Sequence, residues 1–188
     1  MKRLWLIFFL LGMVLGQDKI KTSGYFDEVI DNNVLTLTIK SENTQIIDNE
    51  DKYAILIINS DGGELTLKVF WGDVYLGHNP RSVTYRIGTN DSITEQWEIA
   101  NDYTVTKSNT PIDILEKMVK NTKILFRTRP YQKNAITFEF DISELNSIVE
   151  KFPNHFSNIR PPSVTEILGE TISIIFIGGI FFVILYGL

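Results

Sequence analysis

Arginine and aromatic side chains are the residues of this chain with the clearest potential for binding chemistry. Arg127 and Arg129 lie two residues apart in the segment KILFRTR. Residues two apart in a strand share a face, so both guanidinium groups should point the same way, where together they could bind a carboxylate or phosphate of a partner. The alternative, which we favour, is that they pair with Glu139 or Asp141 on a neighbouring strand.

Aromatic residues supply the remaining candidate binding positions. Arg86 and Trp97 are on successive predicted strands and could stack as a cation–π pair, which we interpret as a scaffold contact. Trp71, Tyr75 and His78 belong to the segment WGDVYLGH, which should form a loop at one end of the fold, where binding residues tend to collect. The candidate binding residues are Trp71, Tyr75, Arg86, Trp97, Arg127 and Arg129.

Catalytic and metal-binding patterns are absent from the sequence. His78 lies two residues before Pro80 and His155 two residues after Pro153, and neither has a second histidine or a carboxylate at metal-ligand spacing. The acidic cluster of Asp48, Glu50 and Asp51 lacks the residue order of a calcium loop. No Gly-x-Ser-x-Gly or Ser-x-x-Lys motif occurs, and the absence of cysteine excludes thiol chemistry. We therefore expect a protein that is not an enzyme and has no metal and no cofactor.

Both ends of the chain are apolar, with different predicted roles. Lys2 and Arg3 precede a run of about a dozen apolar residues, and small residues stand at the −3 and −1 positions before Gln17, so residues 1–16 are predicted to be a secretory signal peptide. Residues 167–188 contain Glu170 as their only charge. As a helix they would span roughly 33 Å, enough for a hydrocarbon core of about 30 Å, and a transmembrane anchor is predicted there.

These two ends predict a membrane-anchored protein whose soluble domain is extracytoplasmic, either periplasmic or on the cell surface. Removing residues 1–16 leaves 16 Lys and Arg against 23 Asp and Glu, a formal charge of −7, which argues against nucleic acid as a partner. For a eukaryotic source, the alternative is a removable lipid-anchor signal near Ser157-Asn158, in which case the glycosylation sequon at Asn90 would matter.

Hydrophobic alternation through the middle of the chain predicts strands, of which the hairpin over residues 53–71 is the clearest. The predicted strands are 34–40, 53–58, 64–71, 82–87, 94–100, 103–107, 123–129 and 135–141. Thr110 and Pro111 predict the start of a first helix, and a second should end at Pro153. We predict a mainly β fold, an antiparallel β-sandwich or curved sheet with two short helices, over residues 17–152, followed by a stalk at 153–166 and the transmembrane helix at 167–188.

Three segments, VTYRIG, QWEIANDYTVTKSNTPIDILEKMVKNTKILFRTRPY and ITFEFDISELNSIVEKF, resemble the VasI-like (TagO-like) family of small exported proteins associated with bacterial type VI secretion. The resemblance covers about residues 53–152. The matching residues are Tyr85, Arg86, Ile87, Trp97, Pro111, Leu115, Arg127, Pro130, Tyr131, Phe138, Phe140, Asp141, Ser143, Leu145 and Ile148. The chain departs from the family pattern by lacking a cysteine beside the strand at 55–58, by matching only vaguely the family's N-terminal Asp-Asp-Ser signature, and by carrying a C-terminal apolar anchor.

Two functions are compatible with these features. The first is a non-catalytic accessory protein that binds envelope proteins, as the family resemblance implies for a secretion apparatus. The alternative is a module that binds a cell-wall glycan or small ligand by stacking on exposed Trp71, Tyr75 and Trp97. The sequence leaves the oligomeric state open.

Overall fold

The computed structural model of the chain describes residues 19–27, 32–78, 80–100, 102–159, 172–177 and 180–185. The predicted signal peptide, residues 1–16, lies outside the described residues, as do residues 160–171, which contain half of the predicted stalk. The statements below concern the described part of the chain.

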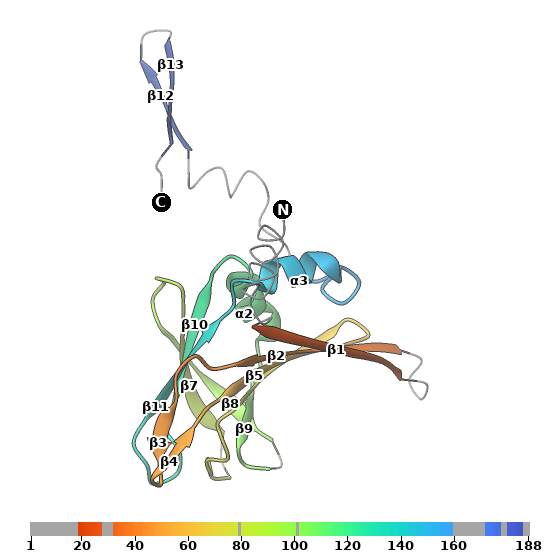
Figure 1. Cartoon of the computed structure of the whole chain (residues 1–188), viewed down its shortest axis with the longest axis vertical. Coiled ribbons are helices and arrows are strands. Elements are labelled where there is room, and N and C mark those ends of the chain that lie inside the picture. Colours follow the sequence, from red (N-terminus) through yellow and green to blue (C-terminus); the bar gives the residue numbers. More distant parts are fainter. Residues whose placement is uncertain are drawn as a thin grey trace, which may run out of the picture.

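The body is a strongly curved antiparallel sheet of nine strands in the order β1-β2-β5-β6-β9-β8-β7-β10-β11 (Figure 1). This confirms the predicted mainly β antiparallel fold. The strands are β1 (Ile20–Asp27), β2 (Asn32–Lys40), β5 (Ile55–Asp61), β6 (Glu64–Phe70), β7 (Arg81–Ile87), β8 (Ile93–Ile99), β9 (Val105–Lys107), β10 (Lys123–Thr128) and β11 (Ile136–Asp141).

Period-two alternation forms the sheet because it gives each strand one apolar face. In β2, Leu35, Leu37 and Ile39 are buried while the residues between them are partly exposed. The turn between β5 and β6 is made by Gly62 and Gly63, both with positive φ, the backbone that a two-residue hairpin needs. The 53–71 hairpin prediction is therefore confirmed.

The sheet curls until its two ends approach each other. The outer edge of β11 is covered by residues 42 and 43: the Glu42 amide donates to the Glu139 carbonyl (2.8 Å), while the Asn43 side chain donates to the Thr137 carbonyl (3.0 Å) and accepts from the Glu139 amide (2.8 Å). Lys19, beside β1, forms an ion pair with Asp141 at the end of β11. The exposed backbone groups of one sheet edge are thus satisfied within the chain.

Two helices, α2 (Pro111–Met118) and α3 (Leu145–Lys151), lie together at one end of the curved sheet (Figure 1). Both were predicted from the sequence. Their apolar faces complete the core, through Ile114, Leu115 and Met118 of α2 and Leu145 and Val149 of α3.

A small hairpin occupies the region that the sequence suggested was an acidic loop. Strands β3 (Gln45–Ile47) and β4 (Glu50–Lys52) pair with each other. Asp48 and Asn49 join them with φ of 55° and 64°, which is the left-handed backbone of a two-residue hairpin turn and is tolerated by Asp and Asn. Lys133 forms an ion pair with Asp48 and ties this hairpin to the β10–β11 connection.

The predictions for the C-terminal region need two corrections. The predicted stalk begins too early, because Phe156 and Ile159 are buried in the core, so the body extends at least to residue 159. Where a transmembrane helix was predicted, Ile172–Ile177 and Ile180–Leu185 pair as antiparallel strands β12 and β13. Glycines between two runs rich in β-branched and aromatic residues favour a hairpin locally. No helix among the described residues is long and apolar enough to cross a membrane.

Candidate functional site

Three connections meet at the end of the sheet away from α2 and α3 (Figure 1). They are the β6–β7 connection at 71–80, the β8–β9 turn at 100–104 and the β10–β11 connection at 129–135. Main-chain hydrogen bonds join them: the Leu76 amide donates to the Tyr103 carbonyl (2.9 Å), and the Tyr131 amide donates to the Tyr75 carbonyl (3.2 Å). Residues far apart in sequence are therefore placed together by backbone contacts.

Four aromatic side chains gather on these connections, and we call them the tyrosine cluster: Tyr75, His78, Tyr103 and Tyr131. Tyr75 is central, with ring centroids 5.8 Å from His78, 6.0 Å from Tyr103 and 5.9 Å from Tyr131, all edge-to-face. The Tyr75 hydroxyl is hydrogen-bonded to His78 Nε2 (2.8 Å), and the His78 and Tyr103 rings are 4.7 Å apart. Edge-to-face packing of this kind holds aromatic rings in place.

The tyrosine cluster is exposed although it is aromatic. Tyr75 is 41% exposed, Tyr103 38% and Tyr131 49%. Contiguous exposed aromatic surface is unusual on a protein without a binding partner, and tyrosine is enriched at protein interfaces, where its ring is apolar and its hydroxyl polar. This surface is therefore the leading candidate binding site of the described body.

Strained backbone occurs in the same loops. Of the five described non-glycine residues with positive φ, three are in this region: Asp73 (59°), Tyr103 (57°) and Gln132 (54°). Asp tolerates this conformation, but Tyr and Gln rarely adopt it. At Tyr103 it is supported by Asp102, whose carboxylate accepts a hydrogen bond from the Thr104 amide (3.2 Å). Strain of this kind tends to persist at functional sites.

Sequence reasoning found Tyr75 and His78 but not Tyr103 or Tyr131 as binding residues. The available signal was modest: each missed tyrosine directly follows a turn residue, Asp102 or Pro130. Only the tertiary contacts bring them beside Tyr75.

The two predicted tryptophans are not binding residues. Trp71 and Trp97 are fully buried. The Trp71 indole donates to the Thr106 hydroxyl (3.0 Å), while Trp97 packs on Phe126 with ring centroids 5.5 Å apart. The predicted stack of Arg86 on Trp97 is also wrong, because Arg86 is on the outer face of β7 and Trp97 points into the core. Glycan stacking on Trp71 and Trp97 is thereby ruled out.

The three predicted arginines are exposed on the outer face of the sheet. Arg127 and Arg129 do share a face, opposite the buried Phe126. The interpretation that they pair with Glu139 or Asp141 is wrong. Glu139 lies 3.8 Å from the Lys123 ammonium, and Asp141 is engaged by Lys19.

The described residues offer no ion-pair partner to Arg86, Arg127 or Arg129. Arg127 stands opposite threonines on both sides, Thr84 of β7 and Thr137 of β11. The charges of these guanidinium groups are therefore not compensated within the described part of the chain.

A partly buried carboxylate, that of Glu95 on β8, joins three elements of the fold. Its carboxylate accepts hydrogen bonds from the Tyr85 hydroxyl (2.8 Å), the Trp97 indole (3.1 Å) and the Thr110 hydroxyl (3.1 Å). Burial raises the pKa of Tyr85, and the hydrogen bond to Glu95 raises it further. Because its donors come from two strands and from the start of α2, Glu95 serves as an internal structural link.

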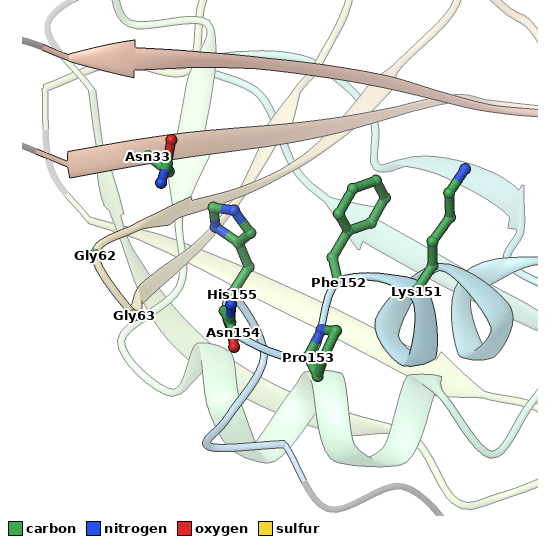
Figure 2. Close-up of a pocket in the computed structure, with 8 residues that line it drawn as sticks. All are labelled: Asn33, Gly62, Gly63, Lys151, Phe152, Pro153, Asn154 and His155. Carbon is green, nitrogen blue, oxygen red and sulfur yellow. The ribbon is translucent and has the colours of Figure 1, made fainter.

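A hollow lies between the β5–β6 turn and the segment after α3, at the end of the sheet opposite the tyrosine cluster. Figure 2 shows His155 and Asn33 extending toward each other there, with Gly62 and Gly63 beside them. His155 is already engaged, since its Nδ1 lies 3.1 Å from the Ser60 hydroxyl, which donates to the His155 carbonyl (3.0 Å). Ser60 is 1% exposed, so its hydroxyl is closed to solvent and the hydrogen bonds with His155 hold the segment after α3 against β5.

Metal ligation has no obvious location in the part of the chain that the structure describes. Within it, no group of three or more His, Cys, Asp or Glu side chains is close enough to hold a metal ion.

Comparison with known proteins finds distant likeness among solved structures alone. No protein-family model matches the sequence, and no curated protein matches it significantly, so the resemblance to the VasI-like family stays a prediction. The crystal structure of invasion associated protein B from Bartonella henselae is similar over 72% of this chain and 92% of that chain, with 3% sequence identity and a TM-score of 0.49.

Proposed function

We propose that this chain is an exported, non-catalytic accessory protein whose β-rich body binds another protein of the cell envelope through the tyrosine cluster. The observation that carries the proposal is the exposure of Tyr75, Tyr103 and Tyr131 on loops that are joined by main-chain hydrogen bonds. A surface that is already ordered loses little conformational entropy when a partner binds. Tyrosine is among the residues that contribute most to binding energy at such surfaces.

The sequence supplies the cellular setting of the proposal. Residues 1–16 have the features of a secretory signal peptide, and residues 172–188 contain no charge, which favours contact of the C-terminal segment with a membrane. The resemblance to VasI-like proteins supports a secretion assembly as the place to look for the partner.

Position-specific photocrosslinking in cells tests the binding surface. A photoreactive amino acid at position 131 should give a discrete crosslinked product containing an envelope protein, and Tyr75→Ala should weaken that product by about tenfold. The matched control is position 25, because Tyr25 is the most exposed described tyrosine (61%) and belongs to β1, away from the tyrosine cluster. Equal products from positions 131 and 25, or none from 131, would contradict the proposal.

Membrane association needs a separate test. The full chain should remain in the membrane fraction after alkaline carbonate extraction, whereas a chain that ends at residue 166 should be released. Release of both proteins would show that the C-terminal segment is not the anchor, and would leave the binding surface untouched.

A further inference from the structure

A polar groove adjoins the tyrosine cluster. It is a solvent-open hollow of about 430 Å³ between the start of β7, the middle of β8 and the β10–β11 connection. The residues that line it are Pro80, Arg81, Ser82, Gln96, Arg129, Pro130, Tyr131 and Gln132. Tyr131 belongs to both the groove and the tyrosine cluster, so the two form one continuous surface.

Arg81 and Arg129 bring two positive charges to this groove without internal compensation. Neither guanidinium forms an ion pair or a hydrogen bond with any residue in the part of the chain that the structure describes. Arg81 Nε is buried and has no acceptor. A buried donor without a partner is costly, and an acceptor that reaches it recovers that cost.

The Arg81 side chain lies directly against Gly77 of the β6–β7 connection. Gly77 has a φ of +95°, and a Cβ atom at that position would lie 2.2 Å from Arg81 Nη2 and 3.6 Å from Tyr131 Cδ2. Any other residue at 77 would therefore displace the guanidinium group from its place against the β6–β7 connection. Arg81 is half-buried, whereas Arg86, Arg127 and Arg129 are exposed.

We infer that this groove binds a carboxylate of an acidic segment of the partner protein, with Arg81 and Arg129 as the groups that recognise the charge. Guanidinium forks match carboxylate geometry and form paired, charge-assisted hydrogen bonds. Ser82, Gln96 and Gln132 supply neutral donors and acceptors beside them, which suits the main chain of a peptide. The inference rests on the proposed protein-binding function and names the chemistry of the partner.

The charge of the whole chain favours a short acidic peptide over an extended polyanion. Without residues 1–16 the formal charge is −7, so a nucleic acid would be repelled outside the groove. A carboxylate that enters beside Tyr131 would also bring its neighbouring residues onto the tyrosine cluster, where an apolar side chain could pack.

Titration with a defined peptide tests the inference directly. The probe is a synthetic peptide of alternating Glu and Phe residues, and its control carries Gln in place of Glu. We expect the Glu peptide to shift the arginine Nε–H NMR signals of Arg81 and Arg129. We expect Arg81→Gln or Arg129→Gln to weaken binding about tenfold or more. Arg86→Gln is the matched control, since Arg86 is exposed and unpaired but outside the groove.

Three results would overturn the inference. One is equal binding of the Glu and Gln peptides, and another is an Arg86→Gln effect as large as that of Arg81→Gln. The third is displacement of the Glu peptide by inorganic phosphate at equal concentration, which would identify a general oxyanion site. If crosslinking from position 131 persists while the arginine variants and the peptide have no effect, the protein-binding function stands and only the carboxylate chemistry is wrong.

Discussion

Replacement of Tyr103 separates the backbone strain of the candidate site from its aromatic contacts. Both Tyr103→Ala and Tyr103→Gly remove the ring and its contacts with Tyr75 and His78. They differ in the backbone, because the φ of 57° at this position is unfavourable for alanine and free of steric cost for glycine. We predict that the glycine variant is more stable than the alanine variant.

The size of the difference follows from two opposing terms. The left-handed conformation costs a residue with a side chain roughly 1–2 kcal/mol. Glycine loses more backbone entropy on folding, which costs about 0.5–1 kcal/mol relative to alanine. The net expectation is that Tyr103→Gly exceeds Tyr103→Ala by about 1 kcal/mol, or about 3 °C in Tm for a domain of this size.

Urea unfolding of the two variants measures this difference, with the same pair of substitutions at Tyr25 as control. Tyr25 is an exposed strand residue without positive φ, so there the glycine variant should be the less stable by about 0.5–1 kcal/mol. The sign of the glycine–alanine difference should therefore reverse between positions 103 and 25. The same sign at both positions would show that Tyr103 is not held in the left-handed conformation and would refute the argument from strain.

Three further changes test the fold that supports the site. Glu95→Ala leaves three donors without an acceptor and should lower the free energy of unfolding by about 3 kcal/mol. The control is Glu98→Ala, at an exposed position of the same strand, which should lower it by about 0.5 kcal/mol or less. Equal losses for the two variants in urea unfolding would contradict the structural role of Glu95. Burial raises the pKa of Asp141, but hydrogen bonds from Lys19 and Ser143 outweigh this effect and lower it to about 2. A folded-state pKa below the ordinary aspartate value of 3.8 adds stability above pH 3.8, and this stability is lost as the pH falls toward 2. Asp141→Asn should therefore reduce the fall of Tm between pH 5 and pH 2, and an unchanged pH profile would contradict this. Gly72, in the β6–β7 connection, has a φ of +74°, and Gly72→Ala would place a Cβ atom 2.5 Å from the Tyr53 carbonyl oxygen. This substitution should lower the free energy of unfolding by more than about 1 kcal/mol. A Tm equal to that of the parent protein would contradict this backbone conformation at residue 72.

Local patterns were sufficient to predict eight strands and both helices of the body, but they missed β1, β3 and β4. Alternation in β2 identified its buried face, and Thr110-Pro111 marked the start of α2, because side-chain period and proline geometry act within a few residues. Even here one detail depended on the fold. The Thr110 hydroxyl donates to Glu95 in place of capping its own helix, since a distant carboxylate competes with the local backbone.

Longer-range features were mispredicted where a local pattern had two structural solutions. The C-terminal apolar segment satisfied the length rule for a membrane helix, yet its central glycines and β-branched residues are equally typical of a hairpin, as in β12 and β13. The positions of Trp71 and Trp97 were ambiguous for the same reason, because a tryptophan in a strand or loop can either bind a ligand at the surface or pack in the core. Only the packing of the curved sheet determined that both are buried.

The sequence by itself determined the mainly β body, its two helices, the acidic charge and the absence of thiol chemistry, because these depend on composition and on neighbours along the chain. The tertiary structure alone decided the candidate site. Tyr75, Tyr103 and Tyr131 come from three different connections, and Arg81 and Arg129 become neighbours of one groove only because β7 pairs with β10. Strand pairing in a curved sheet is a property of the whole chain, so no local pattern could specify which loops would meet.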